Sequence, residues 1–268
     1  MRILPSVALL PLLAVTAVAQ DLHSTRPRVY RIHKLTLVSS DLPGTERDRI
    51  VRAFQGGTYN VDGLSERVRF KLRDKGYALV EVGAPQITRV RTRQSACDAD
   101  VRFAVRTGDQ YRFDEITFTG NSVFSSDQLQ AQFVLQHGAI FNATAIGKGL
   151  ENLKELYGTE GYANFGAIPK LQFDMARHMI SLTIDIDEGR PADFGKLLME
   201  GIEPRAGAAE DLLASWKELE GKRYNPHLVK GWLKRNSASW PGAAAEQAYI
   251  TPFDSGSPSV FNVLLHFQ

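Results

Sequence analysis

The chain alternates apolar and polar residues in short segments that return with a fixed spacing. In residues 112–119, Phe113, Ile116 and Phe118 fall on one side of a predicted strand and polar residues on the other. A second alternating segment covers residues 180–186. Both segments recur 81 residues earlier and 81 residues later, and the first of them then places apolar residues at Ile32, Leu35, Leu37, Phe194, Leu197 and Met199. The pattern predicts three copies of one structural unit.

Between these strands each copy carries a glycine, two variable residues, an aromatic residue and an asparagine. This spacing predicts a joint between two helices, in which the glycine ends the first helix in the left-handed conformation and the asparagine caps the second. Ser125 with Gln128, and Thr45 with Asp48, have capping-box spacing at the start of the first helix. The predicted turn and cap residues are Gly56, Asn60, Gly76, Gly120, Asn121, Gly138, Asn142, Gly161, Gly189, Gly221 and Asn225.

Each copy therefore predicts the order β-α-α-β-β. Two amphipathic helices would cover one face of a three-stranded mixed sheet, which gives an α+β fold with three tandem units. We place the units at residues 30–109, 110–190 and 191–268, the last being the most divergent. The glycine-asparagine step at Gly120 then forms the corner from first strand to first helix. A phosphate-binding loop is the less favoured interpretation.

The N-terminus has the pattern of a secretory signal peptide. Arg2 precedes an apolar run that ends in Ala17-Val18-Ala19, so we predict cleavage after residue 19 and a linker over residues 20–29. The alternative is an uncleaved membrane anchor. No later segment is apolar enough to span a membrane. Cys97 is the only cysteine and lies in a predicted loop, where an intermolecular disulfide stays open.

Composition and motifs give no support for an enzyme. The formal net charge of +2 gives no electrostatic case for nucleic acid binding. The six histidines show no metal-ligand spacing, so we expect no metal site and no cofactor. Asp185 and Asp187 alternate with Ile184 and Ile186, which turns both carboxylates outward on a strand and argues against an acid/base pair.

Three stretches resemble the POTRA (polypeptide-transport-associated) domain family. They are Phe113–Asn121 (F-x-x-I-x-F-x-G-N), Leu153–Tyr162 (L-x-x-L-Y-x-x-x-G-Y) and Ile184–Gly189 (I-x-I-D-E-G). The resemblance implies a periplasmic chain that guides outer-membrane proteins toward a transmembrane barrel. The chain ends at Gln268, so we expect the soluble arm alone, with any barrel on a separate chain.

The resemblance also implies that the second strand of each unit is an exposed sheet edge. Such an edge can accept an extended chain by β-augmentation. We expect these edges at 87–93, 168–173 and 247–253, and the predicted partner-binding residues are Ile168, Lys170, Leu171, Phe173, Ile87, Arg89, Arg91 and Arg93. Alternation would place the three arginines on one side of their strand. The competing interpretations are edges covered by neighbouring units and a solvated, protective arginine face.

Two functions follow from these patterns. The first is a non-catalytic periplasmic adaptor that binds unfolded outer-membrane proteins, or a separate barrel or assembly protein, with peripheral association with the outer membrane. The second is a rigid scaffold arm of an envelope complex, which would include an anchored protein similar to cell-division POTRA proteins if the signal segment were retained.

Overall fold

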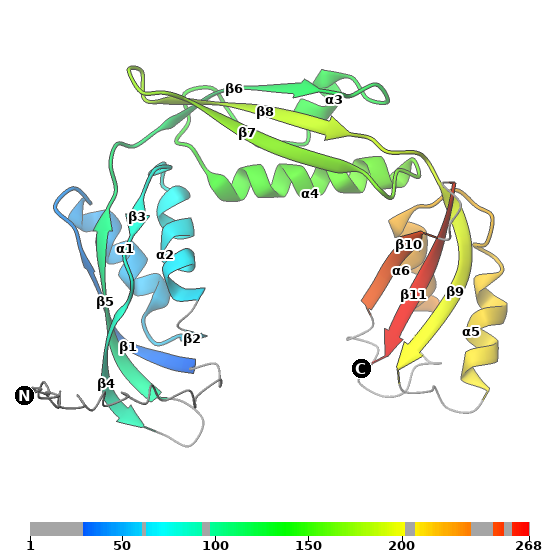
Figure 1. The fold of residues 1–268 in the computed structure, drawn as a ribbon, viewed down its shortest axis with the longest axis horizontal. Helices are drawn as coiled ribbons and strands as arrows, with labels where there is room; N and C mark the ends of the chain where they lie inside the picture. The colour runs from blue at the N-terminus through cyan, green and yellow to red at the C-terminus, as the bar shows by residue number, and fades with distance from the viewer. Residues whose placement is uncertain are drawn as a thin grey trace, which may run out of the picture.

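The computed structural model describes residues 29–60, 63–92, 97–201, 207–236, 249–254 and 259–267. The predicted signal peptide and linker lie outside these residues. The elements form three separate sheets, each with its own helices (Figure 1). We call the residues around the three sheets the first, second and third units. Among the described residues, no helix is both long and apolar enough to cross a membrane.

The second and third sheets have three strands, as predicted. The second has the order β6-β8-β7 and the third the order β10-β11-β9. In both sheets the first strand pairs in parallel with the last, and the middle strand in sequence pairs antiparallel with the last. The strands are β6 (Arg112–Thr119), β7 (Gly166–Asp174), β8 (Met179–Asp187), β9 (Asp193–Gly201), β10 (Tyr249–Asp254) and β11 (Val260–Phe267).

The first sheet departs from the prediction because it has five strands. The second strand is divided at the Gly83-Ala84-Pro85 segment, where proline removes a backbone donor, and a further short strand comes from the loop between the helices. Cys97 opens the last strand, so its predicted place in a loop is wrong. The strands are β1 (Val29–Val38), β2 (Thr58–Asn60), β3 (Glu81–Val82), β4 (Gln86–Thr92) and β5 (Cys97–Arg106).

Each unit contributes two helices to one face of its sheet. They are α1 (Gly44–Phe54), α2 (Leu64–Arg73), α3 (Ser126–Gln130), α4 (Ala143–Thr159), α5 (Ala208–Trp216) and α6 (Pro226–Arg235). The capping box of Ser125 and Gln128 is confirmed. The one predicted at Thr45 is wrong, because α1 begins at Gly44 after Pro43 and has no side-chain cap. On α6, Val229 is buried and the preceding residue, Leu228, is exposed.

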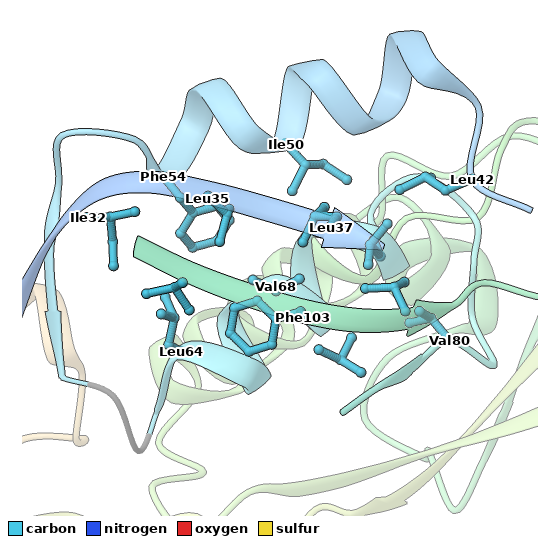
Figure 2. Close-up of a cluster of buried hydrophobic side chains, with 14 of the residues drawn as sticks. Ile32, Leu35, Leu37, Leu42, Ile50, Phe54, Leu64, Val68, Val80 and Phe103 are labelled. Atoms are coloured by element: carbon cyan, nitrogen blue, oxygen red, sulfur yellow. The ribbon is translucent and has the colours of Figure 1, made fainter. Parts of the chain in front are cut away.

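Three hydrophobic clusters lie between the helices and the sheets. Figure 2 shows the first, where Ile50 and Phe54 of α1 and Leu64 and Val68 of α2 lie over Phe103 of the sheet. The apolar positions of the first alternating segment and of its two copies are all in these clusters or packed against them. Two tryptophans, Trp216 and Trp232, pack edge to face in the third core.

Successive units are joined by an equivalent hydrogen bond. The carbonyl of Gly76, after α2, accepts from the Tyr111 N–H at 2.8 Å, and the carbonyl of Gly161, after α4, accepts from the Ala192 N–H at 2.9 Å. In both places the second helix of one unit ends against the first strand of the next. Asp74 adds a bond at the first junction, where it accepts from the Thr144 N–H at 2.9 Å.

Separate cores predict that a core defect stays within its unit. Leu153→Ala should lower the free energy of unfolding of the second unit by about 2–5 kcal/mol, because Leu153 is fully buried in α4. Native-state hydrogen exchange should show faster exchange in β6–β8 and α4, with unchanged protection in β1 and β5. Val134→Ala is the control, since this side chain is 87% exposed. Equal loss of protection in all three sheets would contradict separate cores.

Candidate functional site

The outer side of β7 presents open backbone hydrogen-bonding groups. β7 pairs with β8 over nine continuous positions, from Gly166 opposite Asp187 to Asp174 opposite Met179. Within the described residues no strand pairs with its other side. Alternate residues of an antiparallel edge strand turn their N–H and C=O groups away from the sheet. Pro169 has no N–H and fits such an edge.

The opposite border of the second sheet is partly closed by the unit's own chain. The Gly138 N–H donates to the Phe113 carbonyl at 2.8 Å, and the Phe113 N–H donates to the Ala139 carbonyl at 2.8 Å. Gly56 and Gly221 make the equivalent bonds to Ile32 and Phe194 at 2.8 Å. The loop between the helices therefore occupies the edge of each first strand, a role that its turn chemistry did not predict. In the second sheet this leaves β7 as the open border.

On the face of the sheet away from the helices, β7 presents an apolar and a charged side chain. Ile168, which is 63% exposed, and Lys170 lie on the face away from the helices, opposite Asp185 and Thr183. The Lys170 Nζ lies 2.9 Å from the Asp185 carboxylate, and this hydrogen bond lowers the pKa of Asp185. Asp185 is therefore held in a surface ion pair.

The helix-side face of β7 borders a small hollow, which the sequence did not predict. Leu171, 40% exposed, and Phe173 lie on this side, and Phe173 packs edge to face on Tyr111 with ring centroids 5.4 Å apart. The hollow has a volume of about 340 Å³ and includes Leu79 of the first unit beside α4. It is lined by Arg73, Ala78, Leu79, Phe141, Ala143, Ile146, Pro169, Leu171 and Phe173.

The edges of the other units are less regular or less fully described. β4 pairs with β5, and its register shifts between Arg89 and Arg91, which interrupts the alternation that placed the arginines on one side. Ile87 is partly buried against the first core. The side chains of Arg89 and Arg91, and the whole of Arg93, lie outside the described residues. In the third unit β10 is the edge strand paired with β11.

Comparison with known proteins identifies the second unit. The model of the POTRA family, described as surface antigen variable number repeat, matches residues 111–189. These residues form a POTRA domain. The matched region begins one residue before β6 and ends two residues after β8, so it contains the whole second sheet with α3 and α4.

Curated relatives are similar over longer stretches. A protein of Treponema pallidum (strain Nichols), provisionally assigned as an outer membrane protein assembly factor, is 28% identical over 131 residues, which are 48% of this chain and 16% of the relative. The outer membrane protein assembly factor BamA of Neisseria meningitidis serogroup B (strain ATCC BAA-335 / MC58) is 24% identical over 196 residues, which are 68% of this chain and 24% of BamA. The chain thus spans a quarter or less of these relatives.

A solved structure extends the likeness of fold beyond the POTRA domain. The crystal structure of POTRA domains 3–5 of Haemophilus influenzae BamA matches with a TM-score of 0.70 at 19% sequence identity. The match covers 91% of this chain and 100% of the solved chain. The fold common to the two is the mixed α+β arrangement of helices on sheets described above.

The predicted turn residues of the POTRA domain and its neighbours adopt the expected backbone. All the predicted turn glycines have positive φ. Gly120 also shows why a larger residue would not fit at such a turn, because a Cβ there would lie 2.2 Å from the Ile186 carbonyl oxygen. Asn142 and Asn225 cap α4 and α6, whereas Asn60 lies in β2 and the cap of α2 is Gly63, so that predicted cap is wrong.

A carboxylate holds the strand-to-helix corner of the POTRA domain against the end of its last strand. Glu188 accepts hydrogen bonds from the Ser122 N–H at 2.7 Å, the Val123 N–H at 2.9 Å and the Tyr157 hydroxyl at 2.9 Å. Burial of Glu188 opposes its ionisation. A hydrogen bond from the Ser122 hydroxyl, together with those from the two N–H groups and the Tyr157 hydroxyl, outweighs burial and lowers the pKa of Glu188 to about 2. Asn121 closes the same corner by donating to the Phe124 carbonyl at 2.9 Å.

The first unit makes the same connection with the partners exchanged. Asp41, in the corner, accepts from the Thr107 N–H at 2.9 Å and the Gly108 N–H at 3.1 Å. A bond from the Ser39 hydroxyl is the largest cause that lowers the pKa of Asp41 to about 2. Asp41 precedes Ser122 by the repeat spacing of 81 residues, and Thr107 precedes Glu188 by the same spacing. The carboxylate has therefore changed sides while the connection is kept.

We predict that Glu188→Gln lowers the free energy of unfolding of the POTRA domain by about 1–3 kcal/mol at neutral pH, because hydrogen bonds to a charged acceptor are lost. The folded pKa of about 2 lies below the ordinary value of 4.5. The stabilisation is therefore complete above pH 4.5 and is lost as pH falls toward 2. Denaturant unfolding at several pH values should show that the free energies of unfolding of the unchanged protein and of Glu188→Gln become more similar as pH falls. Glu115→Gln, at an exposed carboxylate of β6, should have little effect. If Glu188→Gln lowered the free energy of unfolding by the same amount at neutral pH and near pH 2, the role of the ionised carboxylate would be contradicted.

Proposed function

We propose that the chain is a non-catalytic periplasmic adaptor in outer-membrane protein assembly. It would bind outer-membrane protein clients, or a separate barrel or assembly protein, by β-augmentation along β7. The open outer side of β7 is the observation that carries the proposal. The relatives named as assembly factors support the process, and the predicted signal peptide supports the periplasm, with peripheral association at the outer membrane.

Main-chain pairing suits a protein that meets many different unfolded chains. Backbone groups are the same in every client, and each hydrogen bond contributes only about 0.5–1.5 kcal/mol net. An added strand over residues 168–173 would therefore bind weakly and without strict sequence preference. Release is as necessary as capture for an adaptor, and a short edge favours it.

Side-chain contacts would give this pairing a mild preference. Alternate residues of an added strand would face the helix side, above the hollow lined by Leu171, Phe173 and Leu79. The intervening residues would face Ile168 and Lys170. A client strand with apolar residues on one side and polar residues on the other fits both faces, and such alternation is the pattern of transmembrane barrel strands.

The adaptor proposal predicts binding of unfolded barrel segments to β7. Peptides from an outer-membrane protein, added to the isotopically labelled mature chain, should shift the amide signals of residues 168–173 and slow their hydrogen exchange. Leu171→Asp should weaken binding about tenfold, because a charge would replace an apolar contact beside the hollow. Leu213→Asp on α5 is the matched control, since Leu213 is 43% exposed and distant in sequence from this site. Equal effects of the two substitutions, or shifts only outside β7, would refute β-augmentation here.

A scaffold is the second candidate, and the junctions between units favour it. Gly76 has a φ of 85°, and a Cβ there would lie 2.8 Å from the Tyr111 carbonyl oxygen. At Gly161, φ is 96° and a Cβ would lie 2.2 Å from the Arg223 Cδ. Both glycines thus permit a close approach of the next unit. Linkers held this closely would restrict motion between units, as a rigid arm requires.

The scaffold candidate predicts a narrow distribution of distances between the first two units. Spin labels at Lys34 and Lys154, with Cys97 replaced by alanine, should give one narrow distance in the otherwise unchanged chain. Gly76→Ala should broaden it, because the added Cβ displaces the Tyr111 backbone. Gly138→Ala is the control: it also has positive φ, at 76°, but no atom lies near its added Cβ. A broad distance distribution in the chain with Gly76 unchanged would argue against a rigid arm. Co-purification of one folded partner, without binding of unfolded clients, would favour the scaffold.

A further inference from the structure

A second hollow lies on the helix layer of the first unit. Its volume is about 530 Å³, and both helices and β2 contribute to it. Phe70 of α2 borders it with 47% of its surface exposed, although Phe70 belongs to none of the three cores. The lining residues are Ala53, Phe54, Tyr59, Glu66, Arg67, Phe70, Lys71 and Arg73.

The hollow is surrounded by cations that remain available. Arg67 stands three residues before Phe70 and four residues before Lys71, so it neighbours both on the surface of α2, and all three residues line the hollow. Arg67 lies 6.0 Å from the centroid of the Tyr59 ring. No ion pair joins Arg67 or Lys71 to a carboxylate of the described residues. Glu66, the acidic residue of the lining, is already bonded to Arg69.

The positive surface continues along the helices. A neighbouring hollow of about 380 Å³ shares Ala53 and Lys71 with the first. It adds Lys75 and also Arg49, which is paired with Glu46. Its one acidic lining residue, Asp74, is engaged by the N–H and hydroxyl of Thr144. We call these two adjoining hollows the groove. Cationic side chains outnumber carboxylates in its lining.

The equivalent position of the second unit differs in chemistry. When α2 and α4 are aligned on Gly76 and Gly161, which follow them, Glu155 stands where Phe70 stands. Glu155 faces the third unit, where His227 Nε2 lies 3.5 Å and Lys230 Nζ 3.4 Å from its carboxylate. The second unit therefore uses this helix position to contact its neighbour, with a charge opposite in sign to that of the groove around Phe70.

We propose that this groove of the first unit docks an acidic segment of a partner protein. One bulky apolar side chain of the segment would enter the hollow beside Phe70, and its carboxylates would pair with Arg67 and Lys71. Complementary charge steers such an encounter, and a buried apolar anchor supplies most of the affinity. An anionic membrane surface also attracts cations. It has no side chain to fill a hollow of this volume, which favours the protein segment. The site contains no residue of β7 and shares only Arg73 with the hollow beside that strand, and the proposal goes beyond the adaptor function proposed above.

The test uses the mature chain and a synthetic glutamate-rich peptide with one central phenylalanine. Titration calorimetry should detect binding that weakens as salt is added. The double variant Arg67→Glu/Lys71→Glu and the single variant Phe70→Ala should each lose affinity about tenfold or more. Lys154→Glu is the matched control, because it reverses an exposed lysine on α4, the equivalent helix of the second unit. Circular dichroism should show that all variants remain folded.

Several outcomes would overturn the proposal. They are equal binding of a lysine-rich peptide with the same phenylalanine, equal losses from Lys154→Glu and the double variant, and binding to phosphatidylglycerol vesicles but not to the peptide. Client binding at β7 should be unchanged in the double variant, so failure of the groove and failure of the adaptor function give different results.

Discussion

Parallel pairing between the first and last strands of each unit is the constraint on which the exposed surfaces depend. A parallel pair needs a long crossover, and here two helices and the middle strand lie between its members. The last strand becomes the centre of the sheet, so the middle strand must lie at a border. The loop between the helices then occupies the other border, through bonds such as that from Gly138 to Phe113. One topological choice therefore leaves β7 open.

The repeated connections tolerate substitution because they are made largely by backbone. At the corner, N–H groups donate to a carboxylate that can come from either side, so Asp41 after β1 of the first unit and Glu188 after β8 of the second make the same connection. At the junctions, the carbonyls of Gly76 and Gly161 bond the next unit whatever side chains surround them. The backbone bonds recur although the residues at equivalent positions differ, as Asp41 and Ser122 do.

Periodicity predicted the features that depend on burial and on turn chemistry. Alternating apolar residues predicted the three cores, and glycine positions predicted the left-handed turns. Alternation could not predict the division of the second strand of the first unit at Pro85, or the five-residue length of α3, because these depend on local hydrogen bonding. The hollows beside Leu171 and Phe70 were also missed, since residues from separate elements and units form them.

Differences between equivalent elements distinguish the exposed surfaces of the first and second units. β7 is continuous through nine paired positions, whereas the second strand of the first unit is divided into β3 and β4 and shifts register between Arg89 and Arg91. A shifted, broken edge is a poor template for an added strand. The helices show the reverse, because α2 exposes Phe70 among cations while α4 places Glu155 against the third unit. The two proposed surfaces, the β7 edge and the groove beside α2, therefore centre on different units, although Arg73 lines the hollows of both.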